Sequence, residues 1–466
     1  MESKEFKALK EQLLSCGRNG FDRMDAAERS AMESYCTDYK AFLDTSKTER
    51  LCAGEVVRLA EQAGYRPYVR GAAVKPGDKV YLCNRGKSVL LAHIGEKPLT
   101  EGVQIAAAHI DSPRLDLKPN PLYEDGELAY FKTHYYGGIR KYQWVTIPLE
   151  LHGVVALKNG EVVRVSVGNG PDDPMFTIDD LLPHLATDQV KKPLGEAIPA
   201  ESLNILVGSR PLRDDEGSDR VKLSVLELLN RKYGIVEEDF LSAELCAVPA
   251  FRAVDIGFDR SLIGAYGHDD RVCAYASLAA LLQLGTPERT AVCMLADKEE
   301  IGSEGVSGMK SRAFDTFMED LCQSQSVPLR ACYERSFCLS ADVTAAYDPN
   351  FAEVYEKRNS ALVNCGMGLC KYTGARGKSG ASDASAELVA YVRGVLDRAD
   401  VVWQMAELGK VDAGGGGTVA MFMAERNIDT LDAGVPVLSM HSPFETVGKL
   451  DCYMTFKGVK AIYEAK

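Results

Sequence analysis

Short apolar runs that lead into an acidic residue or a histidine most constrain the fold of this chain of 466 residues. Residues 103–108 run directly into His109, and residues 292–295 are followed closely by Glu299 and Glu300. In the second half of the chain such runs alternate with helical patterns, which is typical of βαβ units. Because open α/β sheets place their chemistry at strand ends, the pattern predicts an α/β fold with a functional site at one sheet edge.

Five positions at or near the ends of predicted elements carry side chains that can bind a metal ion: His109, Asp269, Glu300, Asp342 and His441. Histidines with carboxylates suit divalent metals, zinc first, with cobalt or manganese as alternatives. Asp111, two residues after His109, would orient the imidazole. Five ligands exceed one open four-coordinate site, but a carboxylate that bridges two metals roughly 3.5–4 Å apart would use all five.

Each of these residues also has an ordinary structural interpretation when it is considered alone. A single histidine is more often a partly buried packing residue, and a single aspartate is more often a cap or turn residue. The adjacent pair Glu299 and Glu300 would ordinarily be a surface acidic loop, since like charges held together raise each other's pKa unless a cation separates them. The joint position of these residues at element ends favours the metal site.

The segment 117–250 differs from the rest of the chain, since short β-rich runs separated by turn residues dominate it. We therefore predict a β-rich domain at 117–250, inserted into a larger domain formed by residues 1–116 and 251–466. Within the last of these segments, a helix is expected after Asp269 and a strand is expected to end at Asp342.

Charge and composition exclude several classes of partner. The net charge is -13, without a cluster of Lys and Arg, which argues against nucleic acid and anionic membranes as partners. Residues 1–7 lack the apolar core of a secretory signal, and no stretch reaches the roughly 18 apolar residues of a membrane span. The 13 cysteines are scattered, without a Cys-x-x-Cys pair, so a cytoplasmic protein with free thiols is expected.

With these motifs in order, the chain resembles the aspartyl aminopeptidase family of dinuclear zinc metallopeptidases. The resemblance covers nearly the whole chain and is carried by residues 107–116, Asp269-Asp270-Arg271, Glu299-Glu300-Ile301-Gly302-Ser303, Ser340-Ala341-Asp342, residues 412–416 and Met440-His441-Ser442-Pro443. It implies a catalytic α/β domain with a central mixed β-sheet flanked by helices, interrupted by a β-rich oligomerisation domain. It further implies a homo-oligomer, a tetrahedral dodecamer, that acts on peptide substrates.

The resemblance also implies roles for the site residues. Asp269 would bridge the metals, with His109 and Asp342 on one ion and Glu300 and His441 on the other. Glu299 would be the general base that takes a proton from the metal-bridging water and returns it to the leaving amine. The peptide bond between Asp269 and Asp270 is expected to be cis.

Two further residues correspond to features of the family. Lys371 lies at the position of a lysine that binds acidic substrate side chains, although the following residues 372–378 diverge. His184 is the nearest match to a histidine that reaches the active site of a neighbouring subunit, and it could equally bind metal or be structural.

Three functions remain in competition. The first is removal of an N-terminal residue, Asp or Glu in the family's pattern, from peptides. The second is a related dinuclear hydrolase, such as a deacylase or a broader aminopeptidase. The third is a non-catalytic scaffold of the same fold.

Overall fold

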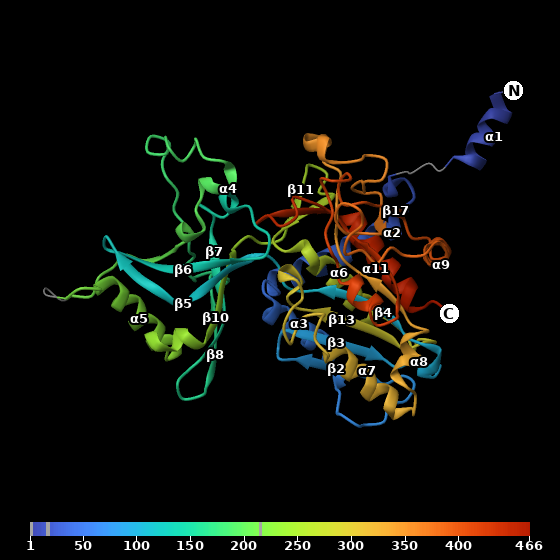
Figure 1. Cartoon of the computed structure of the whole chain (residues 1–466), viewed down its shortest axis with the longest axis horizontal. Coiled ribbons are helices and arrows are strands. Elements are labelled where there is room, and N and C mark those ends of the chain that lie inside the picture. Colours follow the sequence, from blue (N-terminus) through green and yellow to red (C-terminus); the bar gives the residue numbers. More distant parts are fainter. Residues whose placement is uncertain (1–2, 15–18, 214–216) are drawn as a thin grey trace.

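The computed structural model describes residues 3–14, 19–213 and 217–466, and Figure 1 shows them arranged in two lobes. Residues 1–2, 15–18 and 214–216, which fall within the predicted segments 1–116 and 117–250, lie outside the described residues. The lobe on the left of Figure 1 holds a six-stranded sheet, and the larger lobe holds sheets of nine and five strands.

The nine-stranded sheet is the centre of the larger lobe. Its strands, in spatial order, are β1 (Arg66–Pro67), β2 (Lys79–Asn84), β3 (Ser88–His93), β13 (Ala291–Ala296), β4 (Gln104–His109), β14 (Phe337–Ser340), β18 (Asp429–Gly434), β16 (Met367–Cys370) and β17 (Trp403–Met405). Strands β13, β4, β14 and β18 are parallel neighbours, whereas β3 and β16 join this group antiparallel. The predicted central mixed sheet is therefore confirmed.

Helices accompany all three sheets. In chain order they are α1 (Ser3–Leu13), α2 (Ala26–Thr45), α3 (Glu49–Gln62), α4 (Leu194–Ala197), α5 (Arg220–Tyr233), α6 (His268–Leu282), α7 (Ala313–Ser324), α8 (Leu329–Tyr333), α9 (Ala386–Arg398), α10 (Ala420–Ala424) and α11 (Lys449–Tyr463). Helix α1 projects from the larger lobe in Figure 1. Within the described ranges, none of these helices has the length and apolar character needed to cross a membrane.

The central sheet is covered on both faces, which explains why its strands are continuous apolar runs. In β4, Ala106 and Ala108 face a core that includes residues of α2, α3, α6, α9 and α11. The alternate residues Ile105 and Ala107 face a second core with α7, α8 and α10. Since successive strand residues point to opposite faces, a strand buried on both sides must be apolar throughout.

The six-stranded sheet is antiparallel and has its own core. Its order is β8 (Val162–Val167), β7 (Leu149–Ala156), β10 (Ala243–Pro249), β5 (Arg114–Asp125), β6 (Leu128–Tyr136) and β9 (Ile205–Gly208). Trp144 and Phe131 are buried in this core. Strand β5 begins five residues after β4 ends, so the two sheets meet close to His109.

A third sheet lies in the larger lobe. It contains β11 (Val254–Ile256), β12 (Leu262–Ala265), β20 (Glu445–Gly448), β19 (Pro436–Leu438) and β15 (Thr344–Ala345). His441 lies between β19 and β20 and Asp269 follows β12, so this sheet and the nine-stranded sheet together supply the candidate site residues.

Candidate metal centre

Asp269 is the centre of the candidate site. It lies in the first turn of α6, where the backbone departs from helical geometry, and its peptide bond to Asp270 is cis, as predicted. One carboxylate oxygen, Oδ1, is 3.1 Å from Nε2 of His109. The other, Oδ2, is 3.1 Å from Nε2 of His441. A single carboxylate thus faces two imidazoles with two different oxygens, which is the arrangement of a bridging ligand.

The second nitrogen of each imidazole faces a backbone carbonyl. His109 Nδ1 is 3.0 Å from the carbonyl oxygen of Asp111, and His441 Nδ1 is 2.9 Å from that of Gly138. A carbonyl oxygen accepts hydrogen bonds and cannot donate them, so both Nδ1 atoms carry the proton. This tautomer leaves Nε2 of each neutral ring with a lone pair directed at the centre.

The remaining carboxylates divide between the two histidines. Glu300 Oε2 is 3.5 Å from Nε2 of His441. Glu299 Oε2 and Asp342 Oδ1 are each 3.9 Å from Nε2 of His109. The structure therefore gathers the other four predicted ligands and Glu299 around Asp269.

Two overlapping groups have ligand atoms within 4.8 Å of one another: His109, Asp269 and Glu300, and His109, Asp270 and Asp342. Asp270 was not among the residues singled out as ligands from the sequence. Its Oδ2 accepts a hydrogen bond from the backbone N–H of His109, at 3.3 Å, and its Oδ1 is buried without a hydrogen-bond partner among the described residues.

Burial of so many carboxylates is unfavourable unless positive charge accompanies them. Burial and the charge of Asp269 raise the pKa of Glu300 well above its usual value, and burial likewise raises the pKa of Asp342. Burial also raises the pKa of Glu299, although His109 opposes this shift. Among the described residues, Glu300 Oε1 is buried without a hydrogen-bond partner. A divalent cation would satisfy these oxygens and offset their repulsion.

Asp111 holds the loop that carries both glutamates. Its Oδ1 accepts a hydrogen bond from the backbone N–H of Glu299 at 3.1 Å, and its Oδ2 accepts one from Glu300 at 3.2 Å. The hydroxyl of Tyr136 also donates to Oδ2, at 2.8 Å. Asp111 thus holds His109 through its backbone carbonyl and through Oδ1, which is 3.3 Å from His109 Nδ1, and it holds the glutamate pair through the same side chain.

Sequence reasoning missed several residues that contact the centre. Glu445 is buried, and its two oxygens accept hydrogen bonds from the backbone N–H groups of His441, at 2.7 Å, and Asp269, at 3.1 Å. An acidic residue four positions after a candidate ligand was an available signal. No sequence signal marks Tyr136 or Gly138, because both residues come from another sheet and contact residues that are distant in the sequence.

The two predicted substrate residues lie outside this cluster. Lys371 follows β16, whose last residue Cys370 pairs with Asp432, and Asp432 also pairs with Ser340 in β14. Because β16 is antiparallel to β18 whereas β14 is parallel to it, Lys371 and Asp342 continue in opposite directions from this level of the sheet. His184 is exposed in the segment between β8 and α4 of the other lobe, and it is not among the residues gathered around Asp269.

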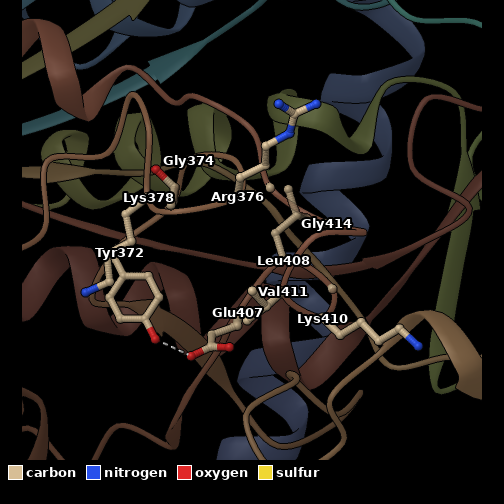
Figure 2. A pocket seen from close by; sticks show the side chains of 12 residues that line it. Tyr372, Gly374, Arg376, Lys378, Glu407, Leu408, Lys410, Val411 and Gly414 are labelled. Carbon is tan, nitrogen blue, oxygen red and sulfur yellow. Dashed lines mark hydrogen bonds between the residues drawn. The ribbon is translucent and has the colours of Figure 1, made fainter.

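A cavity of about 50 Å³ is formed by residues 372–378 and 407–415, directly after Lys371. Tyr372 donates a hydrogen bond to Glu407 at 2.5 Å, and the ammonium of Lys378 lies 3.8 Å from the centre of the Tyr372 ring. Figure 2 shows that the side chains of Arg376 and Lys410 point away from this pair. The cationic groups around the cavity therefore do not converge on one point.

Histidines and carboxylates that converge near the strand ends of a mixed β-sheet are the arrangement of a metal-dependent enzyme of the α/β class. The model of the family described as aminopeptidase I zinc metalloprotease (M18) matches residues 42–463. A probable M18 family aminopeptidase 1 from Clostridium acetobutylicum is 48% identical over 457 residues, covering 96% of this chain and 98% of the relative. The chain therefore belongs to the M18 family of aminopeptidases and is a zinc metalloexopeptidase.

Solved structures agree with this assignment. The crystal structure of an M18 aminopeptidase from Thermotoga maritima has a TM-score of 0.93 at 43% identity, covering 97% of this chain and 100% of that one. That of aminopeptidase I from C. acetobutylicum has a TM-score of 0.92 at 45% identity, with the same coverage. A structure described as the S. cerevisiae mApe1 dodecamer, with a TM-score of 0.76 at 21% identity, shares the fold and covers 93% of this chain and 97% of that one. The predicted fold, family and enzyme class are confirmed.

Proposed function

We propose that this aminopeptidase binds two zinc ions and that Asp269 bridges them. His109 and Asp342 would hold one ion. Glu300 and His441 would hold the other. The observation that carries this assignment is that each oxygen of Asp269 lies 3.1 Å from Nε2 of a different histidine. Imidazole nitrogens and carboxylate oxygens are a suitable donor set for zinc.

Zinc at this site would act as a Lewis acid on the scissile peptide carbonyl. We propose Glu299 as the general base, which accepts a proton from the attacking water and donates it to the leaving amine. The two glutamates differ in exposure to solvent: 20% of the Glu299 side chain is exposed, compared with 3% of the Glu300 side chain. Glu299 is thus open to water, whereas Glu300 is enclosed as a ligand would be. Asp111 positions both residues through their backbone N–H groups.

Replacement of the base tests this division. The variant Glu299→Gln is expected to retain its zinc and to lose about 10²–10⁴-fold in kcat, the usual contribution of general acid–base catalysis. Glu304→Gln in the same loop is the matched control, because Glu304 is exposed and pairs with Lys310. A near-normal kcat for Glu299→Gln would reject the base assignment, whereas loss of zinc would make Glu299 a ligand instead.

We further propose peptides with an acidic N-terminal residue as substrates, with Lys371 binding the side-chain carboxylate. The membership of the chain in the M18 family and the sequence position of Lys371, which matches that of the family's substrate-binding lysine, support this proposal. A panel of aminoacyl substrates assayed with zinc, cobalt and manganese provides the test. Lys371→Met should reduce kcat/KM for Asp and Glu substrates more than for Leu. An equal reduction for all substrates, or a wild-type preference for Leu, would contradict the proposal.

We also propose that residues 117–250 form an inserted domain for homo-oligomerisation. Support comes from the separate sheet and core of this segment and from its exposed apolar side chains, among them Leu181, Leu185 and Val190. His184 in the same segment would reach the centre of a neighbouring subunit. A dodecamer would have a mass near 610 kDa by light scattering, twelve times 50.8 kDa. A mass equal to that of one chain would contradict assembly.

The cytoplasm is the compartment that we propose for this enzyme. The described cysteines are free and most of them are buried. Free thiols persist in a reducing environment, which is characteristic of the cytoplasm.

A further inference from the structure

Strand β6 of the six-stranded sheet ends at the candidate metal centre, although it belongs to the other lobe. Its last residue, Tyr136, is buried and pairs with Arg114 at the start of β5. The Tyr136 hydroxyl donates a hydrogen bond to Asp111 Oδ2 at 2.8 Å. The guanidinium of Arg114 lies 3.9 Å from the centre of the Tyr136 ring, within the range of a cation–π contact. The phenol is therefore held from two sides while its hydroxyl engages Asp111.

The two residues that follow, Gly137 and Gly138, lie directly against proposed ligands. A Cβ atom at Gly137 would lie 3.2 Å from Glu300 Oε2, and Gly137 has a φ of +75°, which disfavours other residues. A Cβ atom at Gly138 would lie 3.2 Å from His441 Nδ1. The absence of side chains at both positions lets the backbone approach Glu300 and His441.

This approach allows a specific hydrogen bond. The carbonyl oxygen of Gly138 is 2.9 Å from His441 Nδ1 and is its hydrogen-bond partner in the described part of the chain. His441 needs such a partner because 37% of its side chain is exposed, so packing alone does not fix the ring. Acceptance by the carbonyl requires the proton on Nδ1, which directs the lone pair of Nε2 toward Asp269 and Glu300.

We propose that Tyr136, Gly137 and Gly138 form a positioning segment through which the six-stranded sheet orients the ligands of the divalent cation. This inference rests on the proposed zinc site. Tyr136 acts through Asp111, which holds the backbone of both glutamates, and Gly138 acts directly on His441. Zinc affinity is therefore coupled to the docking of the six-stranded sheet, because movement of β6 alters both contacts. Ligand-orienting partners of this kind typically contribute 10–100-fold to metal affinity.

The full-length zinc enzyme with the substitution Gly138→Ala tests the segment directly. The backbone of Gly138 lies outside the left-handed region, so alanine is tolerated there, yet its methyl group displaces the His441 ring. We expect the zinc affinity, measured by chelator competition, to fall about 10–100-fold. The visible absorption of the cobalt-substituted enzyme should also change, since it reports the geometry of the ligands. Gly195→Ala is the matched control, because a Cβ atom there would have no neighbour within 4 Å.

The substitution Tyr136→Phe provides a second test that removes only the hydroxyl. It is expected to weaken zinc binding about tenfold and to lower kcat with little change in KM, because the loop of Glu299 and Glu300 is held less firmly. Wild-type zinc affinity and cobalt spectra in both Gly138→Ala and Tyr136→Phe would overturn the inference. His441→Ala separates this failure from failure of the zinc site itself. If His441→Ala also binds zinc with wild-type affinity, the proposed ligand set is wrong.

Discussion

Asp111→Asn is the substitution that tests the geometry of the site most sharply. The Asp111 carboxylate receives hydrogen bonds from the backbone N–H groups of Glu299 and Glu300 and from the hydroxyl of Tyr136, at 3.1, 3.2 and 2.8 Å. Asparagine has nearly the same shape, but one of its terminal atoms is a donor. Whichever way the amide turns, that donor faces at least one N–H group.

The expected effect follows from these contacts. A hydrogen bond to a charged group contributes about 1.5–3 kcal/mol, and the substitution removes at least one and weakens the others. The hydrogen bonds that hold Glu299 in place thus lose about 2–4 kcal/mol. If the activation free energy rises by the same amount, kcat falls roughly 30- to 1,000-fold. The effect should appear in kcat more than in KM, since Asp111 is buried and does not face the substrate.

The assay is steady-state hydrolysis of an aminoacyl substrate at saturating zinc, with circular dichroism to verify folding. Asp125→Asn, at the exposed end of β5, is the control for removal of a carboxylate at a position outside the site. A kcat for Asp111→Asn within threefold of the wild type would show that the position of the glutamate loop does not depend on this carboxylate. That result would refute the role assigned to its hydrogen bonds.

Three further predictions concern stability and metal content. Burial lowers the pKa of His93 to about 4, below its usual value of about 6.5. Between pH 6.5 and 4 only the unfolded chain binds the proton, so the free energy of unfolding should fall by up to about 3 kcal/mol as the pH decreases through this range. Urea unfolding of His93→Phe should lack this part of the pH dependence. Lys47→Met, which leaves His152 as the remaining partner of buried Glu150, should reduce the free energy of unfolding by up to about 3–5 kcal/mol, with partial recovery in Lys47→Met/Glu150→Leu. Removal of zinc by a chelator should abolish hydrolysis and lower the Tm, and added zinc should restore both. An unchanged pH slope in His93→Phe, full stability of Lys47→Met, or a chelated enzyme with unchanged Tm would each contradict the corresponding prediction.

The ligands were accessible to sequence reasoning because local patterns mark them. Apolar runs set the strands, and each run ends where the chain leaves the sheet, so the pattern alone places His109 and Asp342 at one edge. His441 was found by the same rule, although β19 belongs to the five-stranded sheet rather than to the nine-stranded one. The pattern identifies strand ends but not which sheet a strand joins, because pairing depends on contacts between distant segments.

The positioning residues were not accessible for a related reason. Gly138 and His441 are separated by 303 positions, and Tyr136 reaches Asp111 across the boundary between two sheets. A glycine pair after a strand is typical of an ordinary turn, and the sequence contains nothing that distinguishes it from a close approach to a ligand. Only the three-dimensional arrangement shows that these glycines lie against Glu300 and His441.

The adjacency of Glu299 and Glu300 has a physical explanation in this arrangement. Both residues begin a short 3-10 helix after β13, in which consecutive side chains point in different directions. One carboxylate, that of Asp111, accepts the backbone N–H groups of both residues and so fixes the turn. Their side chains then diverge, Glu299 toward His109 and Glu300 toward His441. Two residues joined by one peptide bond can therefore reach opposite sides of Asp269. A longer spacing between them would fix the two carboxylates less accurately relative to each other.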